Sequence, residues 1–96
     1  MNNNIKINLS DCIILGDYLY IAYNSSSLCR ICLSDNEPEF IADVEGRYSF
    51  SKLYTDEKDL YALGYRSGPK IVKLEISEDI EDRVTTITTI TAKELK

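Results

Sequence analysis

The stretch from Asp17 to Ser34, DYLYIAYNSSSLCRICLS, decides the fold of this chain. It consists of an apolar run, a short polar turn and a second apolar run, which is the pattern of a β-hairpin. The polar side chains of Asn24 to Ser27 can hydrogen-bond to their own backbone, as turn residues commonly do. The stretch therefore predicts two antiparallel strands, Tyr18–Tyr23 and Leu28–Leu33.

The same order of parts returns between Lys58 and Ser77, where the sequence reads KDLYALGYRSGPKIVKLEIS. Leu19 recurs as Leu60, and Leu33 recurs as Ile76 at a spacing that is two residues longer. The two extra residues fall in the turn between the paired strands, where insertions are tolerated best. We expect one domain over residues 1–96, containing two internal repeats at approximately 5–44 and 46–90.

Short apolar or alternating runs outside the two hairpins predict further strands. The run Val84–Thr91 is ambiguous, because Val84, Ile87 and Ile90 recur every three residues, which is nearer a helical period. Its threonine and isoleucine side chains lose rotamer freedom in a helix, so we expect a strand there. The acidic stretch Ser77–Asp82 is expected to be a loop. The other expected strands are Ile5–Leu9, Cys12–Leu15, Glu39–Val44, Tyr48–Tyr54, Leu60–Tyr65 and Lys70–Ile76.

These patterns predict an all-β antiparallel protein built from two tandem units of three to four short strands each. In both units a Leu-Tyr pair precedes an apolar strand that ends in serine, and a unit of about forty residues of this kind resembles a β-propeller blade. The signatures of the WD40 and kelch subfamilies are absent, so the resemblance implies no subfamily. Two blades cannot close a ring of about four to eight. The resemblance therefore implies either several chains in one ring, or two units folded into one compact sandwich or roll.

Composition excludes several classes of function. Sixteen acidic and eleven basic residues give a formal charge of −5. Nucleic-acid binding relies on clustered Lys and Arg, so we expect no nucleic-acid partner. No apolar run approaches about 20 residues and no signal-peptide pattern is present, so we expect no membrane association. The odd number of cysteines argues against a disulfide framework and predicts a cytoplasmic location.

Cys29 and Cys32 form a C-x-x-C motif, which binds zinc or exchanges disulfides in other proteins. Within a strand, a separation of three residues sends the two thiols to opposite faces. The sequence contains no second motif of this kind and no histidine, and Cys12 would at best supply a third ligand. We therefore expect buried structural cysteines, with no metal and no cofactor.

The lack of histidine also removes the usual general base and every Ser-His or Cys-His pair. Carboxylate pairs are conceivable in two acidic turns, but solvated turns of this kind are common and neither has the spacing of a calcium loop. We therefore expect no enzymatic activity and identify no small-molecule ligand. The acids concerned are Asp56, Glu57 and Asp59 in one turn, and Glu78, Asp79, Glu81 and Asp82 in the other.

Tyrosines are the best candidates for an interaction surface. In the strand Tyr18–Tyr23, Tyr18 and Tyr20 share one face, and Leu19 and Ile21 share the other. If the Leu19 face is the core, both tyrosines point outward, where tyrosine beside arginine is typical of protein interfaces. The alternative is that these rings fill a core that has few other aromatic residues. The candidate interaction residues are Tyr18, Tyr20, Tyr61, Tyr65 and Arg66.

We expect a non-catalytic module for protein–protein interaction or assembly, which self-associates because two blade-like units leave sheet edges unpaired. The alternative is a small acidic inhibitor or regulator, of the phage or mobile-element type, that docks on a basic site of a larger protein. Carbohydrate binding through tyrosine is a more distant hypothesis.

Overall fold

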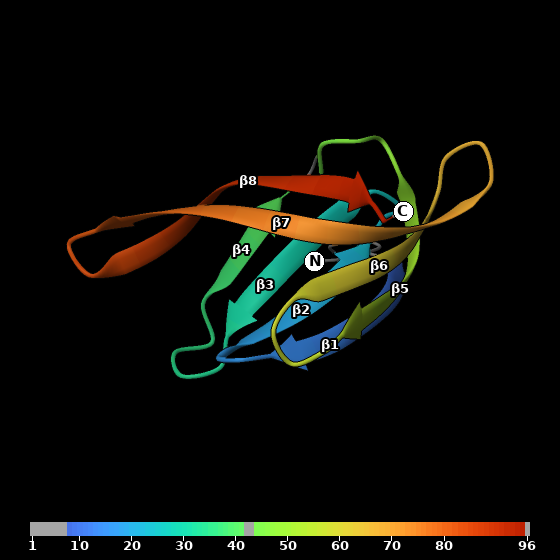
Figure 1. Cartoon of the computed structure of the whole chain (residues 1–96). Helices are drawn as coiled ribbons and strands as arrows, with labels where there is room; N and C mark the ends of the chain where they lie inside the picture. Colours follow the sequence, from blue (N-terminus) through green and yellow to red (C-terminus); the bar gives the residue numbers. More distant parts are fainter. Residues whose placement is uncertain (1–7, 42–43, 96) are drawn as a thin grey trace, which may run out of the picture.

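The computed structural model describes residues 8–41 and 44–95 and folds them into two four-stranded antiparallel sheets, in which the strand order follows the chain (Figure 1). The all-β prediction is confirmed. Sheet A contains β1 (Leu9–Leu15), β2 (Tyr18–Tyr23), β3 (Ser27–Cys32) and β4 (Pro38–Ile41). Sheet B contains β5 (Ser49–Thr55), β6 (Leu60–Tyr65), β7 (Pro69–Glu81) and β8 (Val84–Glu94).

The last two strands decide the ambiguities left by the sequence. Val84–Thr91 lies within β8, so the prediction of a strand there is confirmed. The prediction of a loop at Ser77–Asp82 is wrong, because β7 continues to Glu81 and pairs with β8 as far as Val84. Charged side chains are tolerated because this part of the hairpin is solvated. Residues 5–7 of the expected strand Ile5–Leu9 lie outside the described residues.

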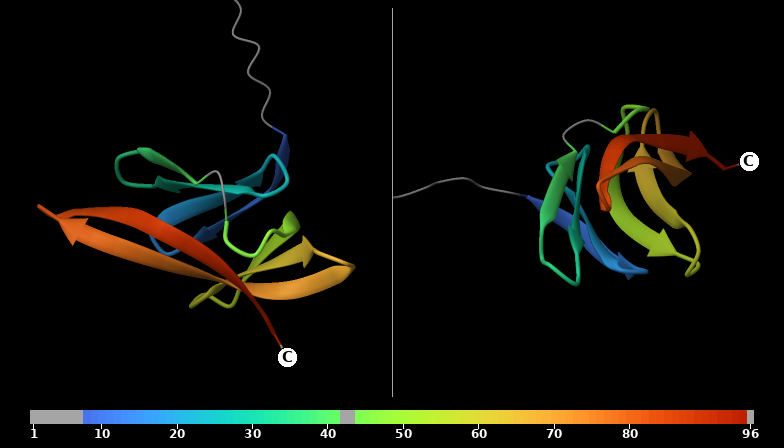
Figure 2. Two further views of the ribbon diagram at one scale, coloured as in Figure 1. Left: turned by 90° about the horizontal axis from the view of Figure 1, so that it is seen from above. Right: turned by 90° about the vertical axis from the view of Figure 1, so that its left-hand side faces the viewer.

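The extended end of this hairpin, Ser77–Thr89, is called the arm below. It projects past the turn between β3 and β4 (Figures 1 and 2). Asp82 and Arg83 form its two-residue turn, with φ angles of 49° and 66°. Positive φ at both central residues belongs to the turn type whose twist suits a β-hairpin.

Each of the two predicted repeats corresponds to one sheet, and the sheets share a specific irregularity. The register of β1 shifts between Leu9 and Asp11, and the register of β5 shifts between Phe50 and Lys52. The extra residues are Ser10 and Ser51, which have the same spacing in the sequence as Leu19 and Leu60. The two units are therefore alike in backbone geometry as well as in sequence.

The sheets face each other as two layers (Figure 2), and the core lies between them. Polar contacts between described residues also join the layers. The Phe50 amide donates to the Ser25 carbonyl (2.6 Å), the Leu53 amide donates to Asp11 Oδ2 (2.8 Å), and Arg30 of sheet A lies 2.6 Å from Glu78 of sheet B. Fully burying one leucine-sized side chain contributes about 1.5–3 kcal/mol, so this shared core is the main source of stability. Its central members are Tyr20, Ala22, Leu28, Phe50, Leu53, Leu60, Ala62, Val72, Leu74 and Ile90.

Three edge features complete the fold. The segment after β4 runs beside β8, where the Glu45 amide donates to the Ile90 carbonyl and the Ala92 amide donates to the Glu45 carbonyl, each at 2.9 Å. β4 begins with Pro38, which is tolerated there because β4 is an edge strand. The bulges at Ser10 and Ser51 lie in β1 and β5, the other two edge strands.

Candidate functional site

The side of sheet A that points away from sheet B carries apolar side chains from all four strands. Strand pairing aligns them in two rows that cross the sheet. The rows are Cys12–Ile21–Cys29–Phe40 and Ile14–Leu19–Ile31–Pro38, and Tyr23 extends the surface on β2. We call these nine residues the A face; none of them is charged.

The A face is partly open to solvent. Ile14 and Phe40 are 58% and 59% exposed, and the Tyr23 ring meets the Phe40 ring edge to face at 6.1 Å. Soluble monomers rarely expose a contiguous apolar patch of more than a few hundred Å² unless it binds something. Neighbouring side chains cover Cys29 and partly cover Leu19, Ile21, Tyr23 and Ile31, so the A face is a candidate interface of modest exposed area.

The outer side of sheet B differs from the A face in its charge. Lysines alternate there with tyrosine and aliphatic side chains. Lys73 Nζ lies 3.7 Å from Asp59, and Lys93 Nζ lies 3.2 Å from Glu75. The residues of this surface, called the B face below, are Lys52, Tyr54, Tyr61, Leu63, Ile71, Lys73 and Lys93.

Of the two alternatives for Tyr18 and Tyr20, the structure supports the one in which these rings belong to the core. Sheet B packs on the side of β2 that carries them, so Tyr20 is a buried core residue and Tyr18 is half-buried. Leu19, which would be the core residue in the other alternative, lies on the A face. Both sides of β2 are apolar, and only the position of sheet B decides between them.

The other three candidate residues belong to sheet B and the loop that follows β6. Tyr61 lies on the B face, and its hydroxyl donates to Asp56 Oδ2 at 3.2 Å. Tyr65 is exposed at the end of β6. Arg66 stacks on the Tyr48 ring at 4.9 Å and donates to the Gly46 carbonyl at 2.8 Å. The five candidates are thus divided between the two sheets and form no single surface.

Arg30 is a central polar residue that sequence reasoning missed. It is 2% exposed in β3, between the two sheets. Its Nε donates to Glu39 Oε2 at 3.0 Å, and its Nη1 lies 2.6 Å from Glu78 Oε2 at the root of the arm. The Tyr18 ring stacks on the guanidinium at 3.9 Å. The available signal was strand alternation, which places Arg30 on the same side as the buried Leu28.

The charge of Arg30 is maintained in this buried position. Burial alone would lower the pKa of Arg30, but hydrogen bonds to Glu78 and Tyr20 and the negative charge of Glu39 raise it above its usual value. Its Nη2 atom has no hydrogen-bond partner among the described residues. Arg30 therefore links sheet A to the arm, at the energetic cost of one unsatisfied polar atom.

Tyr48 packs the segment before β5 against sheet B. Its ring is buried against Gly46 and Gly64, where an added Cβ would approach the tyrosine side chain to 2.8 Å and 3.0 Å. Its hydroxyl donates to Glu94 Oε2 at 2.5 Å. This hydrogen bond lowers the pKa of the Glu94 carboxyl and raises the pKa of the Tyr48 hydroxyl.

A pH-dependent contribution to stability follows from the Tyr48–Glu94 bond. Because the pKa of Glu94 is lower in the folded state, its contribution is complete above the ordinary value of 4.5 and is lost as the pH falls through the lowered value. We expect Tyr48→Phe to be less stable than the natural chain at pH 7, with a difference that shrinks in acid. Urea unfolding between pH 7 and pH 2.5 measures this. Tyr65→Phe, the same change at an exposed ring, should show no such trend; a pH-independent deficit in Tyr48→Phe would contradict the expectation.

Among the three cysteines, the expectation of burial holds for Cys29; Cys32 is half-buried and Cys12 is exposed. Cys29 lies on the A face and Cys32, which pairs with Tyr18, lies on the inner side, as strand alternation predicts. Burial raises the pKa of the Cys29 thiol, which keeps it protonated and unreactive near neutral pH. Within residues 8–41 and 44–95, no three His, Cys, Asp or Glu side chains gather as a metal site.

The acidic turn after β5 also has a structural explanation. Asp56 Oδ1 accepts hydrogen bonds from the amides of Lys58 (3.0 Å) and Asp59 (2.7 Å). These bonds, the Asp59 amide first, lower the pKa of the Asp56 carboxyl. Asp56 therefore organises the turn that precedes β6.

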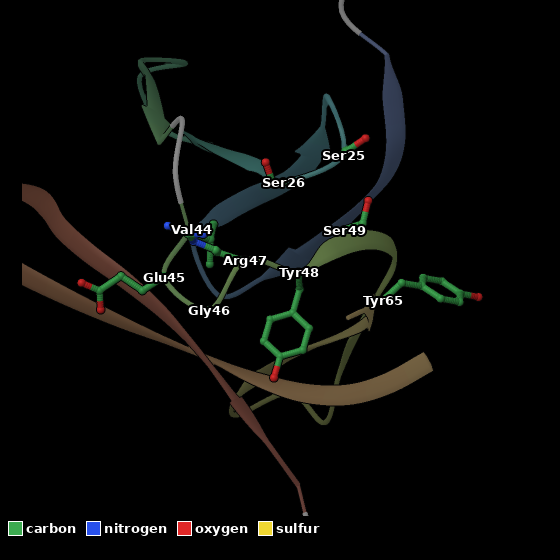
Figure 3. Close-up of a pocket in the computed structure, with 9 residues that line it drawn as sticks. All are labelled: Ser25, Ser26, Val44, Glu45, Gly46, Arg47, Tyr48, Ser49 and Tyr65. Atoms are coloured by element: carbon green, nitrogen blue, oxygen red, sulfur yellow. The ribbon is translucent and has the colours of Figure 1, made fainter. Parts of the chain in front are cut away.

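A hollow of about 710 Å³ lies between the turn of β2 and β3 and the segment Val44–Ser49 (Figure 3). Its polar side chains do not converge. Tyr48 points toward β7 and β8, and Tyr65 points away from the hollow (Figure 3). The hollow thus lacks the group of convergent polar contacts typical of a small-molecule site.

No protein-family model, curated protein or solved structure matches this chain. Across the part of the chain that the structure describes, there is no helix of the length and apolarity needed to cross a lipid bilayer. The A face, with its nine uncharged side chains, is accordingly the candidate functional site.

Proposed function

We propose that this chain is a non-catalytic assembly module that binds further copies of itself through the A face. The single observation that carries the proposal is the pair of uncharged, apolar rows across the outer side of sheet A. Three free cysteines are compatible with a reducing compartment, and the proposal places the module in the cytoplasm.

A second copy is the favoured occupant because the A face offers a partner only apolar area. A partner recognised through its charge would find no charged group there to pair with. Four strands about 4.8 Å apart and about six residues long cover roughly 400 Å² in projection, less than the ~800 Å² per partner of a standard interface. We therefore expect association at micromolar rather than nanomolar concentrations.

Replacing Ile14 with lysine tests the proposal. We expect Ile14→Lys to weaken self-association at least about tenfold, because the interface would bury an unpaired ammonium group. Sedimentation equilibrium between roughly 1 μM and 1 mM would measure this change. The matched control is Ile80→Lys on the arm, where Ile80 is 75% exposed and lies outside the A face. A natural chain that stays monomeric up to the highest of these concentrations contradicts the proposal.

The acidic-inhibitor alternative is favoured by one feature, the arm, which carries Glu78, Asp79, Glu81 and Asp82. The same sedimentation series, run also with poly-lysine added as a basic partner and repeated at high salt, separates the two functions. Self-association through the apolar A face should persist at about 1 M salt and lose no more than its ion pairs contribute, whereas attraction between exposed charges is screened beyond about 3 Å.

A further inference from the structure

Equivalent residues of the two units point in opposite directions relative to the core. Where a residue of sheet A points away from sheet B, its equivalent in sheet B points toward sheet A. Leu19 lies on the A face, away from sheet B, whereas Leu60, its equivalent in the second unit, is buried between the sheets. Ile21 and Ala62 show the same relation. Further pairs are Cys12 with Leu53, Cys29 with Val72, and Ile31 with Leu74. The A face therefore corresponds, residue by residue, to the side of sheet B that packs on sheet A.

The converse correspondence holds for the B face. Leu28 is 1% exposed on the inner side of sheet A, whereas Ile71, its equivalent in the second unit, is 45% exposed on the B face. Arg30, also on the inner side, corresponds to Lys73 on the B face. Tyr20 and Tyr61 form a further pair. The B face is therefore the counterpart of the side of sheet A that packs on sheet B.

Each copy is thus left with two unused faces of matching type on opposite sides of the molecule (Figure 2). We propose that copies assemble head to tail, with the A face of one copy packed on the B face of the next, repeating the contact between the sheets inside the chain. This inference rests on the proposed function and adds which surface of the second copy is bound. Such a heterologous contact propagates into a ring or an open chain instead of closing as a two-fold dimer.

Charge gives this pairing a small advantage over contact between two A faces. Residues 8–41 contain five acids (Asp11, Asp17, Asp35, Glu37 and Glu39) and one base, Arg30, which is a net charge of −4. Two A faces in contact would bring two such sheets together. On the B face the same sheet would meet Lys52, together with Lys73 and Lys93, which already lie 3.7 Å from Asp59 and 3.2 Å from Glu75. The electrostatic gain is therefore small, and the pairing rests on the matching rows of side chains.

The repeat also assigns an ion pair to the contact between copies. Inside the chain, Arg30 of sheet A pairs with Glu78 of sheet B. Replacing each partner by the residue at the same sequence spacing as Leu33 and Ile76 gives Lys73 for Arg30 and Asp35 for Glu78. Asp35 lies in the turn after β3, and Lys73 also lies 3.7 Å from Asp59 of its own sheet. Both have the required sign. Lys73 of one copy would therefore pair with Asp35 of the next.

Two single-face variants and their mixture test the head-to-tail contact. Ile14→Lys blocks the A face and leaves the B face intact; Ile71→Lys makes the same change on the B face. Each variant alone should associate at least about tenfold more weakly than the natural chain. Mixed in equal amounts, with one of them ¹⁵N-labelled, they should form a complex of one copy of each, which native mass spectrometry would detect.

Three results distinguish the possibilities. If Ile71→Lys associates as strongly as the natural chain, the A face binds another A face and the inference is wrong while the proposed function stands. If both variants stay monomeric and the mixture also stays monomeric, the faces do not complement each other and the inference again fails. If the natural chain never associates, the proposed function itself fails. Circular dichroism and urea midpoints of both variants establish that they remain folded.

The assigned ion pair has its own test, a double-mutant cycle of Asp35→Asn and Lys73→Met. The asparagine would keep the side-chain oxygen that accepts the Glu37 amide at 2.9 Å, so the turn should survive. If Lys73 and Asp35 pair between copies, each single change should weaken association about tenfold, and the double variant should be about tenfold weaker rather than hundredfold. Effects that multiply would show that the two side chains do not pair.

Discussion

A variant carrying Glu39→Gln and Glu78→Gln together is expected to lose about 3–5 kcal/mol of unfolding free energy. The two changes leave Arg30 buried between the sheets without a counter-charge. Glutamine still accepts a hydrogen bond, so what is removed is chiefly the negative charge. Arginine does not release its proton near neutral pH to remove the uncompensated charge, because its pKa lies far above that range. For a chain of this length the loss corresponds to a decrease in Tm of roughly 12–40 °C.

Removing the arginine instead should cost less. In Arg30→Met an apolar side chain of similar length occupies the buried site, and Glu39 and Glu78, 26% and 37% exposed, can be hydrated. We expect a loss below about 1.5 kcal/mol, because buried ion pairs are often replaced by apolar residues at little cost. Adding Arg30→Met to the double variant should therefore restore about 2 kcal/mol or more.

Urea unfolding at pH 7 and low micromolar concentration, where association is minimal, would measure all three variants. An Arg30→Met variant less stable than the double glutamine variant would contradict this ranking. It would mean that the packing and stacking of the guanidinium on Tyr18 outweigh its desolvation.

The second large effect is expected at Leu28, and its repeat-equivalent residue supplies the control. Leu28→Ala should cost about 2–5 kcal/mol, since Leu28 is fully buried in the shared core and its truncation leaves a cavity. Ile71→Ala, at the equivalent position of sheet B, should cost under about 1 kcal/mol in the monomer, because Ile71 is exposed. The same urea experiment measures the unfolding free energy of both variants. Equal losses would contradict the difference in burial between Leu28 and Ile71.

The local architecture was accessible from the sequence because each strand is short and bounded by turn residues. Gly16 and Asp17 separate β1 from β2, and Asn24 to Ser27 mark the turn before β3. The constant spacing between Leu19 and Leu60 and between Ser10 and Ser51 located the second unit without any structural information. These signals are local, depending on residues within one hairpin or on a comparison of two hairpins.

Which side of each strand faces the core could not be predicted in this way, because it depends on where the other sheet packs. In Tyr18–Tyr23 both alternating sets are apolar, so period-two alternation gives no contrast between the core side and the open side. Both orientations of the strand therefore stay open from the sequence, and the structure places Tyr20 in the core and Leu19 on the outer side. When the outer face of a sheet is also apolar, the sequence pattern is the same on both faces and does not identify the core side.

The burial of the charged Arg30 side chain was not predicted from the sequence for a related reason. Arg30 stands alone among apolar neighbours, and neither of its partners lies in its own strand: Glu39 belongs to β4 and Glu78 to β7 of the other sheet. The second partner lies in the stretch that was expected to be a loop. This stretch belongs to β7 because it pairs with β-branched residues of β8. Its own high content of charged residues gives no sign of that pairing.

The edges of the two sheets bear on aggregation. Unpaired edge strands invite addition of foreign strands, which is the route to fibrils. Here β1 and β5 are interrupted by bulges, β4 starts with a proline that cannot donate, and Glu45 occupies the backbone groups of β8 near Ile90. All four edge strands thus carry a feature that hinders lateral growth, and the apolar surface that remains is a sheet face. A protein arranged in this way can expose an apolar sheet face for self-association while its protected edge strands disfavour the growth of fibrils.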